Sequence, residues 1–254
     1  MPEARGLKVA SALLLTFVAG YVDIVGYVSV YHLFTAHMTG TTVHLGRDLA
    51  TGAWTAAALA GSVVAGFVGG SVAGRAVIEA GARLGLRTVA TVTIAMESAL
   101  VLAFMITVKM ISAPAVSWGT ICVLLLMLAV AMGLQTATLT RIGPLTVHTT
   151  FVTGMLNKMS QLLSHALFHS YDWLKAEPGG RTHFEAAVKV NLREALFFFC
   201  IWALYLSGAV IGTWSQARWG TDCLYVAIVI LGGAIVLDQI SAFSLQEEKD
   251  QSEL

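Results

Sequence analysis

The sequence contains six apolar runs of about 20 residues, and this length constrains the fold more than any other feature. A helix of about 20 apolar residues crosses the roughly 30 Å hydrocarbon core of a bilayer. Hydrophobic residues make up 57% of the chain and charged residues only 12%, where soluble domains have about 25% charged residues. We therefore expect an all-α membrane protein with six transmembrane helices, at Val9–Tyr31, Trp54–Val77, Thr88–Val108, Val116–Thr138, Leu196–Trp214 and Leu224–Phe243.

The distribution of basic residues predicts the orientation of these spans. With the N-terminus in the cytoplasm, 12 of the 15 lysines and arginines fall in cytoplasmic segments, a strong positive-inside bias. The first run continues past Asp23 to Tyr31 without a small-residue cleavage site, so we interpret it as an uncleaved span rather than a signal peptide. The prediction is a multi-pass protein of the cell (inner) membrane, with both termini and a polar tail at 244–254 in the cytoplasm.

Composition also argues against several classes of function. The net charge is zero, so nothing indicates a nucleic-acid partner. The three cysteines, Cys122, Cys200 and Cys223, have no CxxC spacing and are interpreted as packing residues. The sequence has no nucleophile elbow, phosphate-binding loop or dinucleotide fingerprint. We therefore expect no cofactor and no enzymatic activity, and the lipid bilayer and a small solute or ion are the expected partners.

Two similar polar stretches interrupt the apolar pattern, and each contains a Thr-Gly pair. The first pair is Thr39-Gly40 and the second is Thr153-Gly154. Gly20 precedes Thr39 by 19 residues, and Gly133 precedes Thr153 by 20. This common spacing predicts that the chain consists of two copies of one unit.

The predicted repeats are residues 1–112, with spans 1 to 3, and residues 113–243, with spans 4 to 6. Because each copy has an odd number of spans, the second must be inverted relative to the first. Inverted repeats of this kind recur in secondary transporters, where the substrate site lies near the midplane between the repeats.

Each Thr-Gly segment allows two interpretations. It could be a re-entrant half-helix with its threonine near the N-cap, whose free N–H groups and positive dipole end would face a ligand. It could instead be an amphipathic helix lying at the membrane interface. The second segment is clearly amphipathic, because one helical face carries Met155, Leu156, Met159, Leu162, Leu163, Ala166 and Leu167.

Three acidic residues lie within predicted spans, and one of them, Asp238 near the end of the sixth span, is interpreted as interfacial. A carboxylate at the centre of a bilayer costs about 2.5–3.5 kcal/mol on insertion scales, so Asp23 should face a polar interior. Glu97 could do the same, or it could lie closer to one end of its span and snorkel to the interface. Asp23 could couple transport to protons or cations, or it could form a buried link to another span. Gln135 in the fourth span corresponds in position to the region of Asp23 in the first, and could contact a ligand or a neighbouring helix.

These considerations define a set of candidate residues for binding a substrate or ion. The set is Asp23, His37, Thr39, Gly40, Thr41, Glu97, Gln135, Thr153, Gly154 and Asn157. His44 and Asp48 share a helical face, but no histidine-pair signature accompanies them, and we expect no metal site.

Small residues at four-residue spacing predict close helix contacts. The residues are Gly66, Gly70 and Gly74 in the second span and Gly208 and Gly212 in the fifth. The predicted contact is between spans 2 and 5 within one chain, and the alternative is a homodimer.

Four ordered motifs carry a resemblance to a known family. They are Gly20-Tyr-Val-Asp23, Phe34 with His37-Met-Thr-Gly40, Ala131-Met-Gly-Leu-Gln135, and Thr149-Thr-Phe-Val-Thr-Gly154. In these motifs the chain resembles the YoaK family of multi-span membrane proteins, over nearly its whole length. The resemblance implies an inner-membrane protein whose biochemical role is unassigned. The chain departs from the family at Thr41, where an asparagine usually follows Thr-Gly.

The leading functional prediction is a secondary transporter or permease for a small solute or ion, with a midplane site between the repeats. One alternative is an intramembrane enzyme in which Asp23 and Glu97 act as an acid–base pair. Another is a non-catalytic membrane scaffold.

Overall fold

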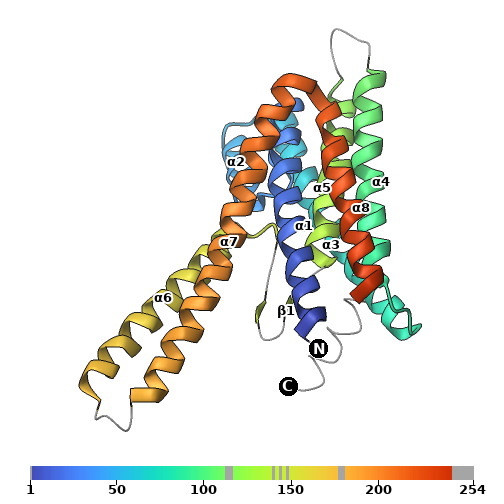
Figure 1. The fold of residues 1–254 in the computed structure, drawn as a ribbon. Helices are drawn as coiled ribbons and strands as arrows, with labels where there is room; N and C mark the ends of the chain where they lie inside the picture. The colour runs from blue at the N-terminus through green and yellow to red at the C-terminus, as the bar shows by residue number, and fades with distance from the viewer. Residues whose placement is uncertain are drawn as a thin grey trace. The chain divides into compact units, whose positions relative to one another are not determined.

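The computed structural model describes residues 2–111, 117–138, 141–142, 145–146, 149–176 and 181–241. The described residues are almost entirely helical (Figure 1). The elements are α1 (Pro2–Ser29), α2 (Met38–Ala50), α3 (Trp54–Arg83), α4 (Val89–Met110), α5 (Trp118–Thr138), β1 (Arg141–Ile142), β2 (Leu145–Thr146), α6 (Val152–Lys175), α7 (Arg181–Trp219), the 3-10 helix η1 (Gly220–Cys223) and α8 (Leu224–Ser241).

The chain forms two compact units. The first, which we call the helical body, comprises Met1–Thr150 and Tyr205–Leu254. The second, the helical hairpin, comprises Phe151–Leu204, and so contains α6 and the first part of α7. The short strands β1 and β2 pair antiparallel in the helical body.

Five helical segments of the described chain are long and apolar enough to cross a membrane. The fifth, Arg181–Ile240, runs from α7 through η1 into α8 and covers the fifth and sixth predicted spans together. Helix α7 begins 15 residues before the predicted start at Leu196. Its first turns carry charged residues and were therefore left out of the predicted span, but they are helical. The ends predicted at Val116 and Phe243, and the tail at 244–254, lie outside the described residues.

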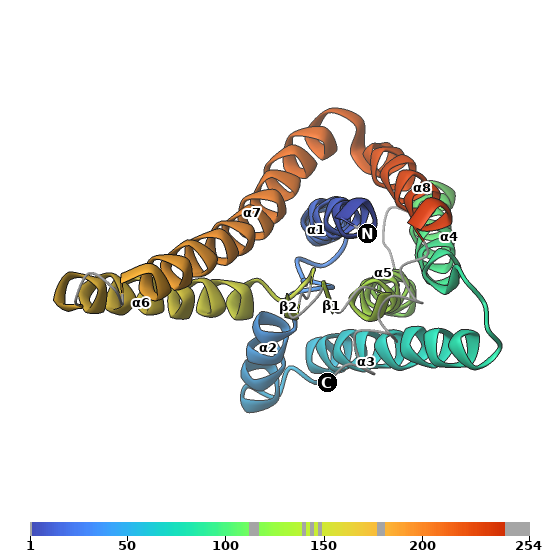
Figure 2. The ribbon, with the colours of Figure 1, turned by 60° about the horizontal axis from the view of Figure 1, so that its bottom comes forward.

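Helices α1 and α5 form the centre of the helical body (Figure 2). In their most apolar stretches 67% of the α1 residues and 56% of the α5 residues are buried, against 33% in α3. Helix α5 packs against α1, α3 and α4, and α8 packs against α1 and α4. The apolar pattern on all sides of α1 and α5 is that of helices surrounded by protein.

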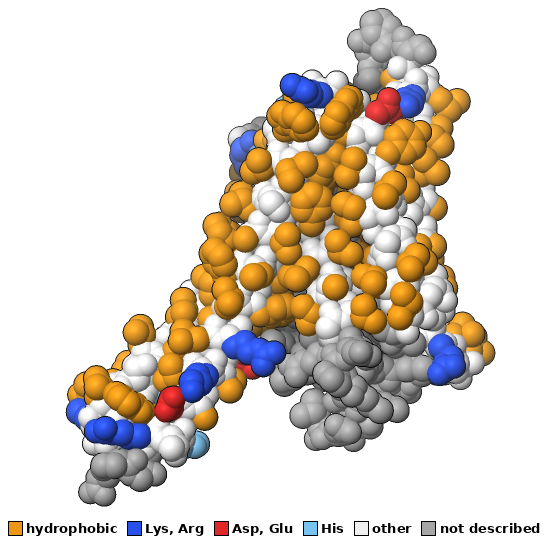
Figure 3. Space-filling model, in the orientation of Figure 1, with side chains coloured by type: hydrophobic (Ala, Val, Ile, Leu, Met, Phe, Trp, Pro, Cys, Tyr) orange, Lys and Arg blue, Asp and Glu red, His pale blue; other side chains and the backbone are white. Residues whose placement is uncertain are grey.

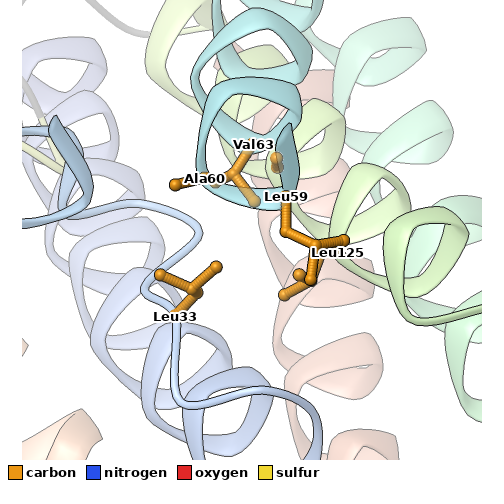
Figure 4. Packing of buried hydrophobic residues seen from close by; sticks show 6 residues of the cluster. Leu33, Leu59, Ala60, Val63 and Leu125 are labelled. Atoms are coloured by element: carbon orange, nitrogen blue, oxygen red, sulfur yellow. The ribbon is translucent and has the colours of Figure 1, made fainter. Parts of the chain in front are cut away.

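The loop between α1 and α2 is fixed by an apolar cluster (Figure 4). Leu33 of this loop packs with Leu59, Ala60 and Val63 of α3 and with Leu125 of α5. All five are at most 3% exposed. Their burial holds the start of α2 against α3 and α5.

The glycines occupy close helix contacts, but their partners differ from the prediction. A Cβ added at Gly70 of α3 would overlap the backbone of Val130 in α5, and one added at Gly208 of α7 would overlap the backbone of Phe17 in α1. Spans 2 and 5 therefore pack against spans 4 and 1, rather than against each other. The small-residue spacing identifies a contact face, but it carries no information about which helix fills that face.

The chain turns from α7 into α8 within four residues. Gly220 has φ +57°, a conformation that is strained for residues with a Cβ. Two contacts fix this corner: the Tyr21 hydroxyl of α1 donates to the Cys223 carbonyl at 2.9 Å, and Lys109 of α4 pairs with Asp222.

The outer surface of the helical body suits a lipid environment. Large apolar side chains such as Val229 and Ile240 of α8 are more than two-thirds exposed. Figure 3 shows hydrophobic side chains along this face, with charged side chains gathered at its end.

Helix α6 of the helical hairpin is amphipathic. Of the apolar face predicted for α6, Met155, Leu162 and Ala166 are buried, whereas Leu167 is 73% exposed. An apolar groove of about 310 Å³ lies between Met159 and Leu163 of α6 and Leu192, Ala195, Leu196 and Phe199 of α7.

Candidate functional site

Asp23 is the centre of the best-connected polar cluster in the helical body. It lies on α1 and is only 2% exposed. Its Oδ1 accepts hydrogen bonds from the backbone N–H groups of Thr35 and Ala36, each at 2.7 Å, and from the Thr35 hydroxyl at 3.3 Å. Its Oδ2 accepts one from the Tyr205 hydroxyl of α7 at 3.0 Å. Four donors satisfy this carboxylate, so in this conformation Asp23 links α1, the α1–α2 loop and α7.

The loop bound by Asp23 leads directly into α2, which carries Thr39-Gly40. The helix begins at Met38, with His37 as its N-cap residue, so Thr39 lies two residues inside the helix. The His37 ring covers the site where Gly40 would carry a Cβ, at 2.6 Å. His37 and Thr39 are exposed, so both can contact a solute.

Thr41 differs from its neighbours because it is fully buried. Its hydroxyl lies 2.8 Å from the Phe34 carbonyl, to which it donates. In this conformation the side chain closes the loop onto α2.

Helix α6 begins with a similar arrangement in the helical hairpin. Phe151 is its N-cap residue, and the Phe151 ring covers the site where Gly154 would carry a Cβ. Thr153 and Asn157 follow on the exposed surface of α6. Each Thr-Gly pair therefore lies in the first turn of a helix, beneath the ring of its N-cap residue.

Glu97 has surroundings opposite to those of Asp23. It lies on α4 and is 0% exposed, and neither carboxylate oxygen has a hydrogen-bond partner among the described residues. Asp23 and Glu97 are not hydrogen-bonded to one another, so the described geometry contains no direct acid–base pair.

Gln135 of α5 is also fully buried, and only one of its two polar side-chain atoms forms a hydrogen bond. Its Nε2 donates to the Leu15 carbonyl of α1, whereas its Oε1 has no partner among the described residues. One turn away, the Thr138 hydroxyl of α5 lies 2.9 Å from the Thr93 hydroxyl of α4. This contact sets the register between α4 and α5.

The predicted site residues therefore lie at several separate places. Asp23 and the start of α2 form one polar cluster, Glu97 on α4 has no hydrogen-bond partner among the described residues, and Gln135 on α5 is bonded to Leu15 of α1. Thr153, Gly154 and Asn157 belong to the hairpin. The described residues contain no group of three or more His, Cys, Asp or Glu side chains able to hold a metal ion.

Known proteins similar to this chain place it in a family. The model of a family described as "Protein of unknown function (DUF1275)" matches residues 11–237, which include every predicted site residue. The chain belongs to the DUF1275 family. A curated relative, the UPF0700 transmembrane protein YoaK of Bacillus subtilis (strain 168), is 26% identical over 225 residues, covering 88% of this chain and 90% of the relative. No solved structure matches the chain.

Membership of DUF1275 and the apolar helices together make the protein an integral membrane protein of a transmembrane family. Three residues of the Asp23 cluster were not predicted from the sequence. Tyr205 was hidden in an apolar run, and a polar hydroxyl in such a run is a signal that could have marked it. Thr35 and Ala36 contribute backbone N–H groups to Asp23, and no residue type indicates such a role in advance.

Proposed function

We propose that this DUF1275 protein is a secondary transporter or permease of a small solute or ion. Its site lies at the midplane between two inverted repeats, residues 1–112 and 113–243. The observation that carries the proposal is a set of matched helix contacts in the two halves of the chain.

The first matched pair of contacts involves the central helices. A Cβ at Gly20 of α1 would overlap the backbone carbonyl of Tyr205 in α7, and one at Gly133 of α5 would overlap that of Phe67 in α3. Gly133 follows Gly20 by 113 positions, and Tyr205 follows Phe67 by 138.

The reverse contacts have the same spacings. A Cβ at Gly208 would overlap the Phe17 carbonyl, and one at Gly70 would overlap the Val130 carbonyl. Val130 follows Phe17 by 113 positions, and Gly208 follows Gly70 by 138. Contacts repeated at the same two offsets support a duplicated unit in which α1 and α5, and α3 and α7, are equivalent.

The Thr-Gly helices follow the same equivalence. The His37 ring lies over Gly40 in α2, and the Phe151 ring lies over Gly154 in α6. Phe151 follows His37 by 114 positions, and Gly154 follows Gly40 by the same number. The hydrogen bonds from the α1–α2 loop to Asp23 have a counterpart in the second half of the chain, where the Thr136 and Thr150 hydroxyls lie 2.7 Å apart. These correspondences support two half-helices that are related to one another by the repeat. With three spans in each half, the two helices would approach a common site from opposite sides of the membrane.

Single cysteines at Thr39 and Thr153 test this access. After Cys122, Cys200 and Cys223 are replaced, a membrane-impermeant thiol reagent applied to oriented vesicles should label position 39 from outside and position 153 from inside. Trapping one side open should lower labelling on the other. Thr41→Cys is the matched control, because that side chain is fully buried and should stay unlabelled.

Labelling of both positions from the same side, or independent labelling with no effect of one upon the other, would mean that the Thr-Gly helices lie at the membrane surface. That result would remove the main support for transport and favour a scaffold.

A further inference from the structure

Glu97 is a buried acid that no contact in the structure explains. It is 0% exposed, and both carboxylate oxygens lack a hydrogen-bond partner among the described residues. An ionised carboxylate in such surroundings loses its hydration without compensation, at a cost of several kcal/mol. We propose that Glu97 binds a proton in this conformation, and that it is the site at which the protein couples to protons.

The elements packed against α4 provide no positive charge that could replace the proton. They are α3, α5, α8 and η1. Their titratable and charged groups are Arg75, Glu79 and Arg83 on α3, Cys122 on α5, Asp222 and Cys223 on η1, and Tyr225 and Asp238 on α8. None of these forms a hydrogen bond or ion pair with Glu97 in the described part of the chain.

Several of these groups are committed elsewhere. Asp238 accepts hydrogen bonds from the backbone N–H and hydroxyl of Thr91, at 2.8 and 2.7 Å. Asp222 pairs with Lys109 at the opposite end of α4. The basic side chains of α3 are exposed. Glu97 therefore faces an interior with a strong preference for a neutral acid.

The register of α4 and α5 places a second unpartnered group at the level of Glu97. Thr93 contacts Thr138, and the two helices run in opposite directions, side by side in Figure 2. Glu97 lies one turn after Thr93, and Gln135 lies three residues before Thr138, so the two are at the same level. The unpartnered Oε1 of Gln135 accepts but cannot donate. A protonated Glu97 would present a donor at the level of this oxygen.

Asp23 shows why this role belongs to Glu97. Four donors stabilise the charged form of Asp23, and moving a proton onto it would break the link to the α1–α2 loop. Proton binding at Glu97 breaks no contact. The coupling role rests on the transporter function proposed above, whereas the proton site itself does not.

Infrared spectroscopy of the purified protein at neutral pH tests the proton site directly. The wild type should show the carbonyl band of a protonated carboxylic acid, shifted in D2O, and Glu97→Gln should lose it. Asp23→Asn, the matched control, should keep it. If Glu97→Gln does not fold, 13C-glutamate labelling of the wild type should shift the same band, because the acid is a glutamate.

Two results would overturn the proposal: absence of the acid band at neutral pH, or a carboxylate band at Glu97 that responds to sodium rather than to pH. Proteoliposomes containing a pH-sensitive dye then separate the two proposals. An acid band without proton movement upholds the site and counts against its coupling role, whereas proton movement lost in Glu97→Gln supports both.

Discussion

At the scale of single residues, the two buried acids are predicted to differ sharply when they are mutated. Asp23→Ala leaves two backbone N–H groups and the Tyr205 hydroxyl without an acceptor, and each unsatisfied buried group costs about 1–3 kcal/mol. Thermal unfolding in detergent should therefore show strong destabilisation. Tyr205→Phe is the control and should cost only about 1.5–3 kcal/mol, because it removes a single hydrogen bond to a charged group. Equal losses in the two variants would contradict the linking role of Asp23.

The sequence predicted a buried Asp23, left open whether Glu97 is buried or snorkels, and did not indicate which acid has partners. The cost of a carboxylate in hydrocarbon follows from residue type and position alone. The four donors of Asp23 come from a loop and from α7, 182 residues away in the chain for Tyr205. Such partners depend on tertiary packing, and therefore only the structure distinguishes Asp23 from Glu97.

At the scale of helices, the glycine contacts predict position-specific effects of alanine. Gly133→Ala and Gly20→Ala would each drive a methyl group into the backbone of the facing helix. Backbones cannot yield as side chains do, so we expect at least the about 1–3 kcal/mol typical of overpacking, and similar losses at both sites. Gly233→Ala on α8 is the control, because a Cβ there meets nothing within 4 Å. Thermal stability in detergent measures all three, and a tolerated Gly133→Ala would contradict the close α3–α5 contact.

Helix positions were predicted better than helix partners. The starts of α3 at Trp54 and α8 at Leu224, and the end of α5 at Thr138, agree with the predicted span limits, because apolar runs end where the chain leaves the membrane. The early start of α7 was missed, since a helix can continue through charged residues after the apolar pattern has stopped. The facing helix of each glycine was also missed, because several helices could supply a compatible surface.

At the scale of the whole molecule, the alternation of spans predicts the side on which each connection lies. The α3–α4 connection near Gly85 should be cytoplasmic, and residues 111–117 between α4 and α5 should lie outside. Alkaline phosphatase, which is active only outside the cytoplasm, should be inactive when fused after Gly85 and active when fused after Met110. A fluorescent protein at the C-terminus should fold, because that terminus is predicted to lie in the cytoplasm. Activity after Gly85 would reverse the proposed orientation.

Helix α1 packs against α7, and α3 packs against α5, so each half of the chain finds packing partners in the other half. This arrangement has a consequence for biosynthesis. Helix α1 gains its contacts with Tyr205 only when that segment of α7 has been made. At about 5–20 residues per second, a ribosome needs on the order of 10–40 s to make the intervening chain. During that time Asp23 lacks the Tyr205 hydroxyl, and the glycine face of α1 is uncovered inside the membrane. The first half of the protein must therefore be held by the insertion machinery, or by chaperones, until the second half is made. A truncated first half is then expected to be a substrate for membrane quality-control proteases rather than a stable fragment.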